Sequence, residues 1–469
     1  MTDITDSAIE AFTKEVQGHL DACQRSGTIE GYVCTATHRR VYAATLFNGM
    51  RHTKAPLQEN RPFHLDVSLV LPNRRGVGFS LEALSIQLFV RQLEFALAQA
   101  VELRHRIQFK KQDTYPQLSP ASHELLQCFA EGNAGSMTTQ LLEQTDGYAA
   151  LVEHPRLMNR EVSVSISLSH RRYCDSAGNV AKEHSAACSV MVAFSLEDSS
   201  ESHSDLFGSL PSAKELKEIV DEASKNIVRT AVRPLDPGLQ LPVLLTHKAA
   251  GDLFDQLVIP NLETRALLDK TGAWEFAHLD TNLIPGLTIE DNPHLEMSPF
   301  STVFDYEGTP TKPVKIMKSG TLVNPLMTSA LLAEVESEFP EWQGRFRLTG
   351  HADSATSTSY TNLFFRVEKP QLPELGQLSY IQIQNLTGMS VDPLTGQFAL
   401  DADGAKVIVN GRVEYSTSLT LRGNFFEALK HASTKAGPLE RHFNSWTPSL
   451  YTEVLSCVSK ELAQNFEEE

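Results

Sequence analysis

Apolar residues along the chain change their spacing several times, between the period of a helix and the period of a strand. Helical spacing runs from about residue 8 to residue 24, and strand-like runs follow at 31–36, 41–45 and 64–71. Ser80 is predicted to cap a helix of about 25 residues, because a broad apolar stripe follows it. The stripe consists of Leu84, Leu88, Leu93, Phe95, Leu97 and Val101. Helices packed on a sheet are the economical arrangement for this order of elements.

A second segment of the same kind is predicted after a polar linker at 110–120. Its apolar alternation indicates two strands, 162–169 and 185–194, around the turn 175–179. The acidic, serine-rich stretch 197–203 is predicted to be a loop, and 212–232 returns to helical spacing. A break with two prolines at 234–238 then leads into short strands and turns.

These patterns predict an α+β fold. Helices on an antiparallel or mixed sheet form the N-terminal layers, and a β-rich C-terminal domain follows. The expected domains are an N-terminal α+β domain at 1–110, a middle α+β segment at 120–235 packed with it, and a β-rich domain at 240–469.

Composition narrows the range of partners. The formal net charge of −17 argues against a nucleic-acid or anionic-membrane surface, because phosphate binding needs clustered Lys and Arg. The chain shows no apolar stretch that could span a bilayer, and its polar, acidic start has no features of a signal peptide. Six scattered cysteines lack the C-x-x-C spacing of a zinc knuckle. A cytoplasmic protein with reduced thiols is expected.

The most specific pattern lies at 386–426, where glycine turns separate short strands. Asn410-Gly411 stands between apolar runs at 406–409 and 413–415, which is a strong hairpin signal. The order and spacing of this block resemble the C-terminal domain of the TldD/PmbA (TldE) peptidase family. Further landmarks that resemble the family are found at 241–245, 289–293, 298–300, 304–309, 348–352 and 361–365.

The resemblance implies two kinds of subunit. TldD-type chains are zinc metallopeptidases that cut extended peptides, including leader segments of modified peptide natural products. TldE-type chains pair with them and carry no metal motif. An older family name, modulator of DNA gyrase, refers to a genetic phenotype and does not imply DNA binding.

In TldD-type chains the metal motif is His-Glu-x-x-x-His, on the first helix of the C-terminal domain. Here that helix is expected at about 249–258, and its apolar pair 253–254 places the motif at 255–260. Both histidine positions are then lost, to Asp255 and Pro260. The general-base position is Gln256, which cannot take up a proton from a metal-bound water. No catalytic residue, metal ligand or cofactor is predicted in this chain, and zinc is expected only in a TldD-type partner.

Other polar residues are weaker candidates. The helix at 249–258 also fits a simple core-packing role. His351, Asp353 and Asn362 lie in family landmarks and are predicted as peptide-contact residues. Carboxylate pairs at 290–291 and at 305 and 307 fit turn-capping or surface roles better than glycosidase chemistry, which requires a specific separation in space.

Three functions remain open. The first is a metal-free TldE/PmbA-like subunit that pairs with a TldD-type metallopeptidase and helps to enclose an extended peptide. The second is a divergent peptidase with a rearranged site built from His351, Asp353 or the acidic loops. The third is a stand-alone, homodimeric peptide-binding protein. The sequence supports participation in proteolysis better than catalysis by this chain.

Overall fold

The computed structural model describes residues 6–47, 58–60, 62–102, 115–116, 122–153, 157–196, 200–224, 233–236, 238–354 and 356–459. The chain forms two compact units. The first unit contains 1–227 together with two later stretches, 293–312 and 327–359. The second unit contains 228–292, 313–326 and 360–469. The predicted linker at 110–120 lies largely outside the described residues, as does the end of the helix predicted at 212–232.

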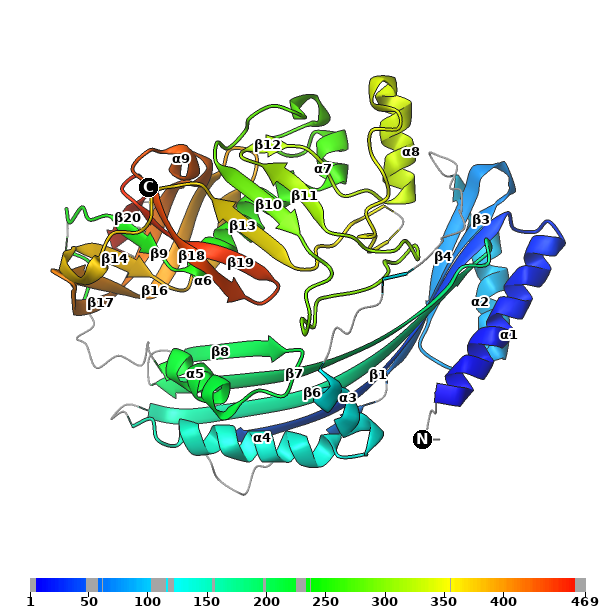
Figure 1. Ribbon diagram of the computed structural model, residues 1–469, viewed down its shortest axis with the longest axis horizontal. Helices are drawn as coiled ribbons and strands as arrows, with labels where there is room; N and C mark the ends of the chain where they lie inside the picture. The colour runs from blue at the N-terminus through cyan, green and yellow to red at the C-terminus, as the bar shows by residue number, and fades with distance from the viewer. Residues whose placement is uncertain are drawn as a thin grey trace. The chain divides into compact units, whose positions relative to one another are not determined.

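The first unit is built on an antiparallel sheet in the order β5-β4-β3-β1-β6-β7-β8, with β2 paired to β1 (Figure 1). Its strands are β1 Gly31–Phe47, β2 Gln58–Asn60, β3 Phe63–Leu71, β4 Arg75–Leu81, β5 Val101–Glu102, β6 Leu157–Asp175, β7 Val180–Leu196 and β8 Ser200–Phe207. Its helices are α1 Asp6–Arg25, α2 Ile86–Gln99, α3 His123–Ala130, α4 Ala134–Ala149, α5 Ala213–Ser224 and α8 Ser329–Glu338.

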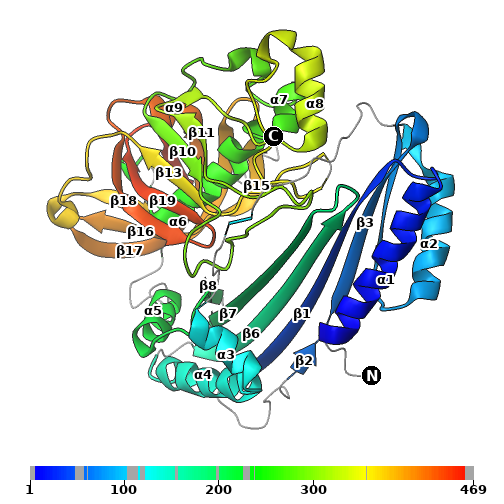
Figure 2. The same cartoon turned by 45° about the vertical axis from the view of Figure 1, so that its right-hand side comes forward.

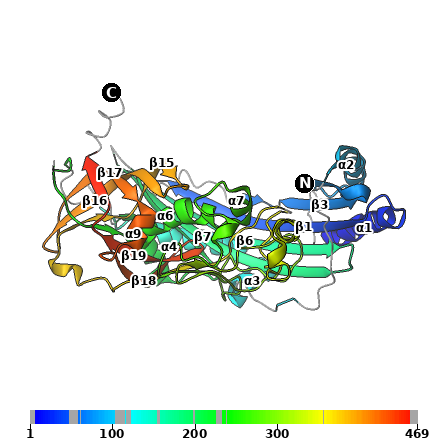
Figure 3. The same ribbon diagram turned by 90° about the horizontal axis from the view of Figure 1, so that it is seen from above.

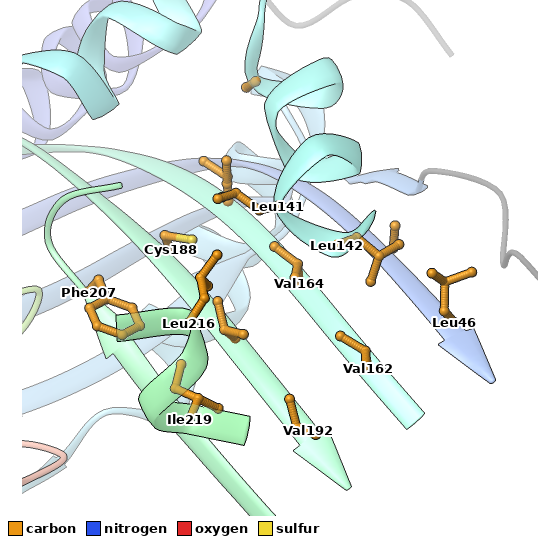
Figure 4. Packing of buried hydrophobic residues seen from close by; sticks show 14 of the residues in the cluster. Leu46, Leu141, Leu142, Val162, Val164, Cys188, Val192, Phe207, Leu216 and Ile219 are labelled. Carbon is orange, nitrogen blue, oxygen red and sulfur yellow. The ribbon is translucent and has the colours of Figure 1, made fainter. Parts of the chain in front are cut away.

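Two groups of helices cover the two ends of the long strands (Figure 2). At one end α1 and α2 pack on alternate residues of β1, including Tyr32 and Cys34. Figure 3 shows the same strands from above, with α1 and α2 at this end. At the other end α3, α4 and α5 enclose a second core with Leu46, Val162 and Val192 (Figure 4). Even-numbered residues of β1 thus contribute side chains to both cores, because side chains alternate between the two faces of a strand.

The helix predicted to start at Ser80 is shorter and begins later. Residues 75–81 form β4, which pairs with β3, and Ser80 lies opposite Asp66 in that hairpin. The observed cap is Ser85, whose hydroxyl accepts the N–H of Leu88 at 3.3 Å. The buried face of α2 is Phe89, Leu93 and Ala96. The predicted stripe was partly wrong, because Leu88, Phe95 and Val101 are exposed.

The loop predicted at 197–203 was also partly wrong. Residues from Ser200 onward belong to β8, which pairs with β7 along its whole length. Residues 197–199 lie outside the described part of the chain. Backbone pairing with β7 outweighs the low strand propensity of Ser and Glu here.

The stretch 293–312 packs on the face of the first unit's sheet opposite to the helices. Phe304 joins Val33 and Tyr173 in a small buried cluster, and the Arg171 guanidinium lies 4.2 Å from the centre of the Phe304 ring. The Glu183 carboxylate pairs with Arg171 at 2.9 Å and accepts the backbone N–H of residue 303 at 2.7 Å. Side-chain contacts from β6 and β7 thus hold this part of the chain.

The second unit is built on a mixed sheet in the order β12-β11-β10-β13-β19-β9-β14-β16-β17-β20, with β15 paired to β16 and β18 to β19. Its strands are β9 Val243–Leu245, β10 Leu287–Asp291, β11 Val314–Lys318, β12 Thr321–Leu322, β13 Leu363–Val367, β14 Tyr380–Ile383, β15 Thr387–Asp392, β16 Gln397–Val409, β17 Arg412–Asn424, β18 Lys435–His442, β19 Ser445–Thr452 and β20 Ser456–Ser459. Its helices are α6 His247–Leu253, α7 Thr264–Asp269 and α9 Phe425–Lys430.

The predicted hairpin is confirmed. Asn410 and Gly411 join β16 to β17, and both have positive φ, 50° and 74°. These angles suit a two-residue turn whose twist matches that of the flanking strands. The predicted α+β class, with an antiparallel N-terminal sheet and a β-rich C-terminal region, is confirmed as well. The proposed domain bounds stay a prediction. Among the described residues, no helix is long and apolar enough to cross a membrane.

Candidate functional site

The predicted motif positions lie in a widened helical turn. Helix α6 is α-helical to Leu253, and 254–258 then form a π-helix in which the N–H of Ile259 donates to the carbonyl of Phe254. A short 3₁₀ turn at 259–261 follows, with Pro260 inside it. A π turn brings residues five apart towards one face, which is the spacing of the two histidines in His-Glu-x-x-x-His. Position 255 lies in the π segment, whereas position 260 lies in the 3₁₀ turn after it, and neither is a histidine.

Aromatic packing fixes this turn in place. Phe254 is fully buried, stacks on Phe365 of β13 at 4.4 Å between ring centres, and meets the edge of Phe425 at 5.1 Å. Leu253, Leu257 and Val258 are also fully buried. The apolar face predicted for this helix is thus confirmed, and it orients the polar positions between these residues.

Two carboxyl groups on the other side of the turn hold protons more tightly than usual. Burial raises the pKa of Asp255 to about 7, and the charge of Asp252 adds to that shift. Burial raises the pKa of Asp252 to about 6, although the N–H of Leu386 partly opposes the change. The Asp255 side chain is nevertheless exposed to solvent, so a ligand could reach it. The pair forms an acidic, proton-binding surface on the helix.

The donor set does not fit zinc. Across the six motif positions the side chains offer one carboxyl, Asp255, together with an amide, three apolar groups and a proline. Zinc is held by Cys, His or carboxylate ligands, usually four in structural sites and three in catalytic sites. In the part of the chain that the structure describes, no group of three or more His, Cys, Asp or Glu side chains is arranged to hold a metal ion.

Gln256, at the predicted general-base position, has an unusual hydrogen-bond acceptor. Its side-chain oxygen is buried and has no hydrogen-bond partner among the described residues. An unsatisfied buried acceptor costs about 1–3 kcal/mol. This group was not recognisable from sequence, because only the packing around the helix isolates the amide.

The three predicted peptide-contact residues differ in their exposure to solvent. His351 and Asp353 belong to the first unit and Asn362 to the second. His351 is buried with its Nδ1 2.9 Å from the carbonyl oxygen of Thr349. Asn362 is also buried and donates to the carbonyl of Asn292 at 2.8 Å. Asp353 is exposed on a loop, so it alone is directly accessible.

The carboxylates of the landmark at 304–309 connect separate loops of the first unit. The Asp305 carboxylate accepts backbone N–H groups of Glu307, Thr309 and Ala352 at 2.8–2.9 Å. The Glu307 carboxylate accepts the N–H and hydroxyl of Ser329, both at 2.8 Å. Burial raises the pKa of Asp305 to about 6 and that of Glu307 to about 7. These groups are loop-organising carboxylates, as the turn-capping interpretation predicts.

The raised pKa of Asp255 has a consequence for stability. The folded protein holds this proton more tightly than the unfolded chain, whose aspartates titrate near pH 4. The contribution of Asp255 to the free energy of unfolding therefore falls as the pH rises from about 4 to about 7. We expect Asp255→Asn to raise the melting temperature relative to wild type more at pH 8 than at pH 5. Equal differences at the two pH values would contradict the shift.

Comparisons with known proteins agree on the type of domain. Residues 238–459 match the model of the PmbA/TldA metallopeptidase C-terminal domain. Metalloprotease PmbA of Escherichia coli O157:H7 is 27% identical over 226 residues, which are 48% of this chain and 47% of that protein. The match thus spans about half of the length of this curated relative.

Solved structures share the fold over nearly the whole chain. TldE from Thermococcus kodakarensis has a TM-score of 0.75 at 14% identity, and covers 94% of this chain and 99% of its own. A protein of Thermotoga maritima MSB8, described as a candidate modulator of a DNA gyrase, has a TM-score of 0.77 at 17% identity, over 95% and 100% of the two chains. At these identities the likeness shows the fold alone.

The fold is of the α+β class, and the C-terminal domain matches a domain type found in metallopeptidases. Residues 238–459 therefore form a domain of the PmbA/TldA metallopeptidase C-terminal type, as the sequence landmarks predicted.

Proposed function

We propose that the chain is a metal-free TldE/PmbA-type subunit. It would pair with a TldD-type zinc metallopeptidase in the cytoplasm and take part in cutting or maturing extended peptides. The observation that carries the proposal is the substitution of all three motif positions by Asp255, Gln256 and Pro260 on an otherwise well-packed helix. A polypeptide that keeps the domain but lacks the ligands is suited to binding and enclosing substrate.

The chemistry of the turn supports a role in peptide contact. Asp255 is exposed and Asp252 is half-buried, and the oxygens of both carboxyl groups can accept hydrogen bonds. Peptide N–H groups and basic side chains are the donors that such a surface accepts. We infer that this turn contacts the substrate where a TldD-type subunit would hold zinc.

The test is to mix the purified chain with a TldD-type subunit and to follow both complex formation and peptide cleavage. We expect a complex by size-exclusion chromatography and cleavage that a chelator abolishes. The chain alone should not cleave the same peptide. The proposal fails if no complex forms and the partner's activity is unchanged.

One outcome would favour a different role. A stable homodimer that binds peptide without a TldD-type subunit would support a stand-alone binding protein. Chelator-sensitive cleavage by the chain alone would instead indicate a divergent peptidase.

A further inference from the structure

A cavity of 710 Å³ lies within the second unit, and none of its lining residues belongs to helix α6. It is lined by residues 235–236 and 238–242, which precede β9, by Ile381 of β14, and by 453–459, which include β20. The volume falls in the range of about 300–1,000 Å³ that is typical of ligand pockets. These three segments are far apart in sequence, so no local pattern indicated the cavity.

The walls are mainly apolar. Leu235 and Leu455 are buried, and Val454 is exposed at the opening. Cys457 also lines the cavity, and burial raises the pKa of its thiol to about 12, so the side chain is neutral near pH 7. The cavity therefore favours apolar side chains of a ligand.

Strand β20 lines this cavity and is the last strand in the order of the sheet. It pairs with β17 on one side and ends the order of the sheet, so the described residues provide no strand on its other side. Alternate residues of such an edge strand direct N–H and C=O groups outward. An extended peptide can pair with these groups as an added strand.

The charged groups at the opening are acidic. Asp236 and Glu453 line the cavity and are exposed, and no Lys or Arg is among the described lining residues. Arg233 lies 3.5 Å from the Asp236 carboxylate and partly offsets it. Glu453 forms no ion pair in the described part of the chain. A basic ligand residue therefore complements the opening better than an acidic one.

We propose that this cavity is a second peptide site, which takes an extended apolar segment flanked by basic residues as a strand added to β20. The inference rests on the proposed role in handling extended peptides. It concerns a surface distinct from the α6 turn. The added strand would hold a substrate segment by its backbone, while Glu453 favours Lys or Arg beside it.

The test uses the full-length chain without a partner. The probe is a fluorescein-labelled Lys-Val-Ile-Val-Lys pentapeptide with blocked ends, and binding is followed by fluorescence anisotropy. Glu453→Lys should weaken binding about tenfold or more, whereas Glu374→Lys, an exposed residue outside the cavity, should not change it. A probe with glutamate in place of lysine, and one with N-methylated backbone amides, should each bind about tenfold more weakly.

Two results would overturn the proposal. One is equal binding of the unmodified probe and the N-methylated probe, because strand pairing requires the backbone N–H donors. The other is unchanged binding to Glu453→Lys, provided its melting temperature equals that of wild type. Neither result depends on complex formation with a TldD-type subunit, so the site and the proposed pairing can fail separately.

Discussion

Replacing Gly308 by alanine is expected to lower the free energy of unfolding of the first unit by about 3 kcal/mol or more. Gly308 has a φ of +69°, and an added Cβ would overlap the Tyr173 ring. That ring is fully buried, with its hydroxyl 2.5 Å from the carbonyl oxygen of Glu307 and 2.9 Å from the Asp175 carboxylate. The Tyr115 hydroxyl also donates to the Gly308 carbonyl at 3.0 Å. The loop therefore has little freedom to move away.

Gly344→Ala is the matched control. Gly344 lies in the same unit and has a φ of +75°, but no atom lies within 4 Å of an added Cβ. This change should lower the free energy of unfolding by about 1 kcal/mol, through backbone strain alone. Denaturant unfolding followed by circular dichroism measures both variants. Equal losses would show that contact with Tyr173 contributes nothing to stability.

Replacing Phe254 by alanine is expected to lower the free energy of unfolding of the second unit by about 3–5 kcal/mol. The ring is fully buried between Phe365 and Phe425, and its loss would leave a cavity beneath the π turn. Because the exposed Asp255 lies on this turn, the variant should also weaken any peptide contact made there. Unfolding is followed by tryptophan fluorescence, to which Trp274 and Trp446 of this unit contribute.

Phe95→Ala is the control for aromatic truncation. Phe95 is 64% exposed on α2 and should change stability by less than about 0.5 kcal/mol. If Phe254→Ala changed the free energy of unfolding as little, burial of the Phe254 ring would not stabilise the π turn.

Local patterns predicted several elements correctly and failed where distant segments decide the structure. The Asn-Gly turn at 410–411 follows from residues beside it, so its prediction was confirmed. Alternation at 77, 79 and 81 was the available signal for β4, but the apolar residues after Ser80 favoured a helix. The packing of 293–312 in the first unit depends on contacts with Tyr173 and Arg171, which are far away in sequence.

Some features of the candidate site can likewise be predicted from the sequence, and others cannot. The sequence shows that the predicted motif positions 255 and 260 are not histidine, and it shows the apolar face of the helix. The π turn, the raised pKa of Asp252 and the isolated oxygen of Gln256 arise from tertiary packing, which spacing does not encode. Burial of His351 and Asn362 likewise depends on loops that lie elsewhere in the sequence.

The zinc content of the chain purified alone tests the central claim most directly. The protein would be incubated with zinc, desalted and analysed for metal, beside a TldD-type subunit treated in the same way. We expect far less than one zinc per chain here and about one zinc in the TldD-type subunit. One tightly bound zinc per chain, lost on replacement of Asp255, would contradict the account.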